Sequence, residues 1–171
     1  MKRLLAALCL AWMTSAQAIP DAARALAPDW TVLGQGEMRW FGLRLYSAEL
    51  WSSRARFDPE QTFALRITYA RRFEGKRLSS ASIDEMRRIG YQDAAQLARW
   101  QQTMNRVFPD VAEGDVLTGV YLPERGAVFY LGPRLLAEVD DAEFARAFFA
   151  IWLDPRTREP ALRQQLLGQA K

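Results

Sequence analysis

Hydrophobic and polar positions follow two periods along the chain, and these separate expected strands from expected helices. From Trp30 onward the period is the short one of strands, as in Phe63–Tyr69, where apolar and polar residues alternate. Elsewhere apolar residues recur every third or fourth position, as on the buried face of a helix. The expected strands are 30–33, 37–41, 43–51, 63–69, 115–122, 127–131 and 135–139, and the expected helices are 19–28, 82–90, 92–108, 144–152 and 160–168.

Turn and capping residues separate these segments. Gly34-Gln35-Gly36 predicts a turn, residues 123–126 predict a four-residue turn, and residues 82–85 have the pattern of a capping box. Asp140 and Glu143 are expected to cap a later helix. The order of strands, helices, strands and helices predicts an α+β fold, with an antiparallel or mixed sheet backed by a layer of helices.

The N-terminus has the three parts of a secretory signal peptide. Lys2 and Arg3 are basic, residues 4–13 are apolar, and residues 16–18 form an A-x-A cleavage site. The apolar run is shorter than the roughly 20 residues that span a bilayer. We therefore expect residues 1–18 to be removed, residues 19–171 to form a single domain, and the protein to be exported, most simply to a periplasm.

Composition narrows the possible chemistry. The 171 residues include no histidine, which excludes His-based nucleophile pairs and His zinc motifs, and the single cysteine, Cys9, lies in the leader. Without residues 1–18 the chain has 21 basic and 20 acidic side chains and no evident basic patch, so we expect no nucleic-acid partner. We also expect no metal and no cofactor: Gly34 and Gly36 lack the third glycine of a dinucleotide loop, and the acidic residues 140–143 are explained by helix capping.

The hairpin of residues 37–51 holds the most specific candidate site. If its loop is Phe41-Gly42, Arg39 faces Arg44, and Tyr46 lies diagonally from Arg39 on the same face. An arginine and a tyrosine on a partly apolar face could hold a carboxylate or an enolate. Two alternatives remain: both arginines face water, or a three-residue loop puts Arg39 and Tyr46 on opposite faces.

A distributed set of residues resembles the chalcone isomerase-like proteins. It begins with residues 36–51 and continues with Tyr69, the pair 71–72, Gly75, Leu78 and Glu85, then 108–109, 114–115, 144–153, Pro160 and 166–168. The resemblance covers roughly residues 30–168, and it implies an open-faced sandwich, an antiparallel sheet backed by helices with a ligand cleft between them.

The resemblance also implies site residues. Arg39 matches the arginine shared by the isomerases and the fatty-acid-binding relatives. Tyr46 matches the tyrosine that joins it in the fatty-acid binders, where isomerases have a threonine. Phe73 and Ser80 stand where isomerases use a tyrosine and an asparagine, which argues against chalcone isomerisation.

The leading hypothesis is non-catalytic binding of an elongated apolar carboxylate such as a fatty acid, with Arg39, Tyr46, Phe73 and Ser80 as ligand-binding residues. The first alternative is an intramolecular lyase acting on a chalcone-like phenol, in which Arg39 stabilises a developing oxyanion. The second is an envelope interaction module with a degenerate cleft.

Overall fold

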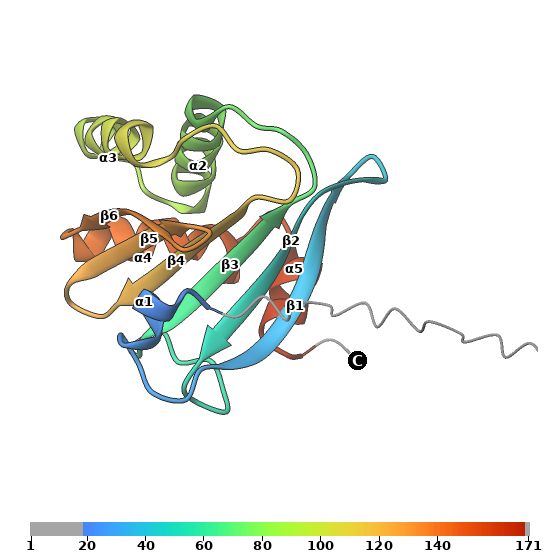
Figure 1. The fold of residues 1–171 in the computed structure, drawn as a ribbon. Helices are drawn as coiled ribbons and strands as arrows, with labels where there is room; N and C mark the ends of the chain where they lie inside the picture. The colour runs from blue at the N-terminus through green and yellow to red at the C-terminus, as the bar shows by residue number, and fades with distance from the viewer. Residues whose placement is uncertain (1–18, 170–171) are drawn as a thin grey trace, which may run out of the picture.

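Six consecutive strands form one antiparallel sheet in the order β1-β2-β3-β4-β5-β6, so every strand pairs with its neighbour in sequence (Figure 1). The computed structural model describes residues 19–169. The strands are β1 (Thr31–Trp40), β2 (Leu43–Ser52), β3 (Phe63–Tyr69), β4 (Val116–Leu122), β5 (Gly126–Leu131) and β6 (Arg134–Val139), and the helices are α1 (Asp21–Arg24), α2 (Gly75–Ile89), α3 (Ala94–Val107), α4 (Ala142–Leu153) and α5 (Pro160–Leu166).

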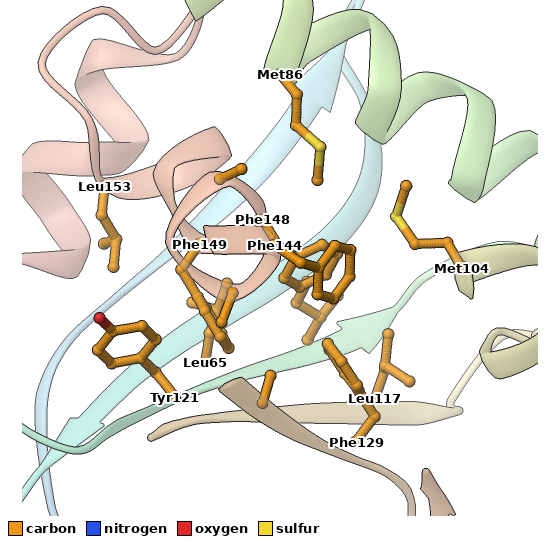
Figure 2. Close-up of a cluster of buried hydrophobic side chains, with 14 of the residues drawn as sticks. Leu65, Met86, Met104, Leu117, Tyr121, Phe129, Phe144, Phe148, Phe149 and Leu153 are labelled. Atoms are coloured by element: carbon orange, nitrogen blue, oxygen red, sulfur yellow. The ribbon is translucent and has the colours of Figure 1, made fainter. Parts of the chain in front are cut away.

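The predicted α+β class is confirmed, since four of these helices cover one face of the sheet. Helix α4 packs on β4 and β5, α5 packs on β1 and β2, and the α2–α3 pair packs against α4 through α2. Figure 2 shows the aromatic side chains of α4 meeting the sheet, with Met86 and Met104 descending from α2 and α3. The Phe148 ring lies 5.2 Å from that of Phe129, and the Phe149 ring lies 5.1 Å from that of Phe63.

The opposite face of the sheet is covered in part by the N-terminal segment. Ile19 and Ala23 pack in a cluster with Ala64, Val120 and Tyr130, which point away from the main core. Helix α1 has four residues, so the predicted helix over 19–28 is much shorter in the structure. None of the helices in the described part of the chain is both long enough and apolar enough to span a bilayer. The predicted signal peptide, residues 1–18, lies outside the described residues.

The predicted turn at Gly34-Gln35-Gly36 is wrong, because this segment lies inside the continuous strand β1. A Cβ atom at Gly34 would lie 2.0 Å from the carbonyl oxygen of Gln165, and one at Gly36 would lie 2.7 Å from Cδ1 of Leu162. The glycines therefore allow α5 to lie directly on the strand, which is a packing requirement and not a turn.

Two helix starts also differ from the prediction. Helix α2 begins at Gly75, and Ser82 lies inside it, where its hydroxyl donates to the carbonyl of Leu78 at 2.9 Å. The N-cap of α4 is Asp141, whose Oδ1 accepts from the backbone N–H of Phe144 at 2.8 Å, and Asp140 is exposed. The N-cap residue of α2 makes no capping hydrogen bond with its side chain, so a search for a capping residue could not find the start of this helix, whereas two adjacent aspartates could each have been the cap of α4.

Candidate functional site

A cavity of about 550 Å³ lies between the sheet and its helices. Its mouth is marked by exposed lining residues, including Trp40 at the end of β1 and Arg77 on α2. The apolar lining comes from the sheet and from α2, α4, α5 and the segment after α3; it includes Met38, Leu45, Ile67, Phe73, Leu78, Phe108, Leu117, Phe148, Ile151, Trp152 and Leu162.

A bulge in β2 determines which side chains of the first hairpin reach this cavity. Trp40 pairs with Leu43 and Arg39 with Arg44, but Met38 pairs with Tyr46, so Leu45 is the extra residue. Two residues of β2 then lie opposite one residue of β1, and β2 bends at this point. Leu45 and Tyr46 both line the cavity as a result, together with Met38.

The prediction that Arg39 and Tyr46 share a face is therefore wrong. The loop has two residues, as expected, but the bulge shifts the alternation of side chains between Arg44 and Tyr46. Arg39 does not line the cavity, and its side chain is 56% exposed. Of the alternatives considered, the one in which the arginines face water describes Arg39.

Glu37 holds both arginines at the tip of the hairpin. Arg39 Nη2 lies 2.7 Å from Glu37 Oε2, and Arg44 Nη1 lies 3.2 Å from Glu37 Oε1. Arg39 Nη1 also donates to the carbonyl of Gly42 at 3.2 Å. Hydrogen bonds from the two guanidinium groups hold the pKa of Glu37 below its usual value. The sequence analysis missed this carboxylate, although its spacing from Arg39 is that of same-face neighbours on a strand.

Tyr46 is fixed in the cavity wall by a helix far away in sequence. Its hydroxyl accepts a hydrogen bond from Nε1 of Trp152 in α4 at 3.0 Å. Burial raises the pKa of Tyr46 to about 12, and the nearby carboxylates of Glu159 and Glu85 act in the same direction. Tyr46 is therefore neutral at physiological pH, and its own O–H remains available as a donor.

Tyr69 stands beside Tyr46 as its cross-strand partner, with the ring centroids 6.3 Å apart. Its side chain is 5% exposed and lines the cavity, and its hydroxyl has no hydrogen-bond partner among residues 19–169. Burial raises its pKa as well. The Tyr69 hydroxyl is not one of the fully enclosed polar atoms that lack a partner in the described part of the chain, so it is open to the cavity. It can therefore donate a hydrogen bond to a ligand there.

The structure separates the other two predicted residues. Phe73 lines the cavity, 5.7 Å from the ring of Tyr69. Ser80 is exposed on α2, accepts from Nε2 of Gln101 at 3.2 Å, and does not line the cavity. Ser82, two residues further along α2, lines it instead.

Charged groups line the mouth of the cavity. Arg158 Nη2 lies 2.9 Å from Glu85 Oε1, and Arg77 Nε lies 3.3 Å from Glu74 Oε2. Asp84 and Glu159 are the other charged lining residues. Residues 19–169 contain no His or Cys, and within them no group of three or more Asp or Glu side chains is placed to hold a metal ion. The arrangement suits an elongated apolar molecule with a hydrogen-bonding end.

Comparisons with known proteins agree on one family. The sequence profile described as "Chalcone isomerase-like" matches residues 15–168. An uncharacterised protein of Haemophilus influenzae is 32% identical over 143 residues, which cover 83% of this chain and 70% of that protein. The crystal structure of a fatty-acid binding protein of Arabidopsis thaliana superposes with a TM-score of 0.60 over 89% of this chain and 90% of that chain. At 11% identity this likeness shows a shared fold.

Proposed function

The chain belongs to the chalcone isomerase-like family, and on this premise we propose that it binds an elongated apolar molecule of the fatty-acid class in the cavity between sheet and helices. The cavity itself carries the proposal. Its volume of about 550 Å³ lies in the usual range of small-molecule sites, about 300 to 1,000 Å³. Each methylene buried against its walls contributes about 0.8 kcal/mol. The solved fatty-acid binding protein of the same fold supports this ligand class.

The polar end of the ligand is assigned to Tyr46 and Tyr69. Both phenols are neutral at physiological pH, burial keeps them so further into the alkaline range by raising their pKa values, and both can donate. Tyr46 is positioned by Trp152, and Tyr69 has no other partner among the described residues. Arg77 and Arg158 are the lining cations, and from the mouth their positive charges compensate in part for a carboxylate held by the two phenols.

The proposed role is binding without catalysis, and two features of the residues support it. The chain has no histidine, and neither tyrosine can act as a base near neutral pH. We place this binding in the periplasm, on the signal-peptide pattern of residues 1–18. Cell fractionation of the full chain tests the location. A protein shortened by the signal peptide is expected in the periplasmic fraction.

Ligand binding is tested by native mass spectrometry of the purified protein, followed by titration of the delipidated protein with saturated fatty acids of 12 to 18 carbons. A co-purifying acid and saturable binding are expected. If no acid is carried and none binds, the proposal is wrong. An assay with a hydroxychalcone tests the absence of catalysis, since turnover above the buffer rate would instead indicate an isomerase.

The polar end is tested by Tyr69→Phe, with Tyr130→Phe as the matched control. Tyr130 is also buried, at 4% exposed, but it lies in the cluster on the opposite face. Loss of one hydrogen bond of about 0.5 to 1.5 kcal/mol lowers the affinity of Tyr69→Phe by roughly twofold to tenfold. Tyr130→Phe is expected to bind like the wild type. Equal affinities of Tyr69→Phe and wild type would overturn the assignment while leaving the cavity proposal intact.

A further inference from the structure

The turn between β1 and β2 projects beyond the rest of the sheet (Figure 1). Pairing of β2 with β3 begins at Tyr46 and Tyr69, so Leu43 and Arg44 extend past the end of β3. At the tip, Phe41 is 90% exposed, Trp40 53% and Leu43 52%. We call residues 40–43 the hairpin tip. It is the most exposed cluster of large apolar side chains in the described part of the chain.

Folding does not explain this choice of residues. Phe41 and Gly42 have φ values of 46° and 79°, and a turn with two positive φ values is the kind that favours Asn-Gly. A bulky aromatic residue is disfavoured in the left-handed region, and leaving its ring in water forgoes the free energy of burial. Within residues 19–169 the one aromatic ring that packs on Phe41 is that of Trp40, edge to face at 5.1 Å. Phe41 therefore disfavours the folded state both by its backbone conformation and by its exposed ring. A residue of this kind points to a function other than folding.

The charges around the hairpin tip are mainly positive. Arg39 and Arg44 share Glu37, and Arg71 donates from Nε to the backbone carbonyl of Arg44 at 3.3 Å. Three guanidinium groups and one carboxylate give this contact network a net charge of +2. Arginines behind exposed aromatic side chains match the chemistry of an anionic bilayer surface, where rings enter the headgroup region and cations meet lipid phosphates.

We propose that the hairpin tip docks the protein on an anionic lipid bilayer, with Phe41 and Leu43 entering the interface and Trp40 beside them. Three side chains on a narrow projection are far from the roughly 800 Å² per partner of a stable protein interface, but they suit partial insertion into lipid. Trp40 belongs both to the tip and to the cavity lining. Docking at the tip therefore brings the cavity mouth to the membrane surface, where an apolar ligand is available.

Phe41→Asn tests this proposal without damaging the fold, because Asn-Gly is the favoured pair for this turn. Delipidated wild type is expected to co-sediment with vesicles of phosphatidylglycerol and phosphatidylethanolamine. Losing about 1.5 to 3 kcal/mol of phenyl burial lowers the vesicle affinity of Phe41→Asn by roughly tenfold or more. Its thermal midpoint is expected to equal or exceed that of the wild type.

Leu135→Asn provides the control, since Leu135 is 49% exposed on β6, at the opposite edge of the sheet. It is expected to bind vesicles as the wild type does. The proposal is wrong if wild type fails to co-sediment, if Phe41→Asn binds equally well, or if Leu135→Asn loses as much. It is also wrong if Phe41→Asn instead abolishes self-association of the wild type, which would make the tip a contact between copies of the chain.

Vesicle binding and ligand binding can fail separately. Tyr69→Phe is expected to co-sediment like the wild type, because Tyr69 is buried, and Phe41→Asn is expected to keep its fatty-acid affinity in vesicle-free solution. Failure of the vesicle experiment alone removes membrane docking and leaves the cavity proposal standing.

Discussion

Arg39 and Tyr69 are placed in opposite surroundings, and this decides which of them can serve a buried ligand. Arg39 is solvated and paired with Glu37 at the hairpin tip. Tyr69 is buried in the cavity wall with an unused donor among the described residues. A weak neutral donor inside the cavity is worth more to a ligand there than a strong cation outside it, because solvent screens the exposed charge.

Replacing Arg39 by alanine is expected to leave fatty-acid affinity unchanged within about twofold, as for a surface substitution away from the site. Isothermal titration of Arg39→Ala beside Tyr69→Phe makes the comparison. A loss of affinity in Arg39→Ala larger than that in Tyr69→Phe would mean that Arg39 turns into the cavity when the ligand binds.

Tyr46 is expected to make the folded protein sensitive to alkali. Its pKa of about 12 in the folded state exceeds the ordinary value of about 10, so the folded state keeps a proton that the unfolded state loses. This contribution to the free energy of unfolding is complete below about pH 10 and is lost as the pH rises toward 12. Tyr69 acts in the same direction.

Urea unfolding at several pH values checks this expectation. Between pH 9 and 11.5, Tyr46→Phe is expected to lose less stability than the wild type, even though it starts lower for want of the Trp152 hydrogen bond. Parallel pH profiles for the two proteins would contradict the raised pKa.

Asp141 joins two elements at the start of α4. One of its oxygens caps the helix at Phe144, and the other accepts from Nε1 of Trp100 in α3 at 3.0 Å. Asp141→Ala removes the cap, worth about 1 kcal/mol, and leaves a buried indole donor without its partner, at a cost of about 1 to 3 kcal/mol. Denaturant unfolding is expected to show a loss of roughly 2 to 4 kcal/mol.

Asp140→Ala is the control for this prediction. Asp140 carries the same charge, one position earlier, and is exposed. Its replacement is expected to change the free energy of unfolding by less than about 0.5 kcal/mol. If the two variants lose equal stability, the charge near the helix dipole matters and the hydrogen bonds of Asp141 do not.

Elements with a clear period could be predicted from the sequence, but the contacts between distant elements could not. Strand β3 has the predicted bounds because its alternation is regular, with Phe63 and Leu65 on the core face. Tyr46, which directly follows the bulge at Leu45, bonds to Trp152, which is 106 residues away in sequence. Gly34 resembled a turn residue because nothing near it in sequence signals that α5 packs on the strand.

The same distinction applies to the candidate site. Arg39 and Tyr46 were predicted from the hairpin pattern and the resemblance, and Phe73 and Ser80 from the resemblance alone. Tyr46 and Phe73 line the cavity, whereas Arg39 and Ser80 do not. Tyr69 was noted only as part of the resemblance. Its importance rests on a missing hydrogen bond, which becomes visible only when the surrounding side chains are in place.

At the scale of the whole molecule, a ligand that fills the cavity between the sheet and the helices is expected to stabilise the folded state. Apolar walls around an unfilled volume lose van der Waals contacts. Binding to the folded state alone contributes about 2.7 kcal/mol at a ligand concentration of 100 Kd. For a domain of this size, that corresponds to a rise in Tm of roughly 5 to 10 °C.

Thermal unfolding of delipidated protein with and without palmitate measures this rise. Wild type and Tyr130→Phe are expected to show it in full. A variant with the cavity filled by a larger side chain, Leu117→Trp, is expected to show little or none. An equal rise in Leu117→Trp would place the ligand somewhere other than the cavity.

The bulge at Leu45 also limits how this hairpin can vary in length among relatives. It fixes Tyr46 opposite Met38 regardless of what lies beyond it. Adding one residue to each arm beyond Leu45 lengthens the projection by one pair and leaves the cavity wall in register. An unpaired insertion in β1 just before Met38 would instead shift the register, so that the side chains of the cavity wall would turn to the other face of the sheet. The outer part of the hairpin can therefore vary in length, while the part that lines the cavity cannot shift by a single position.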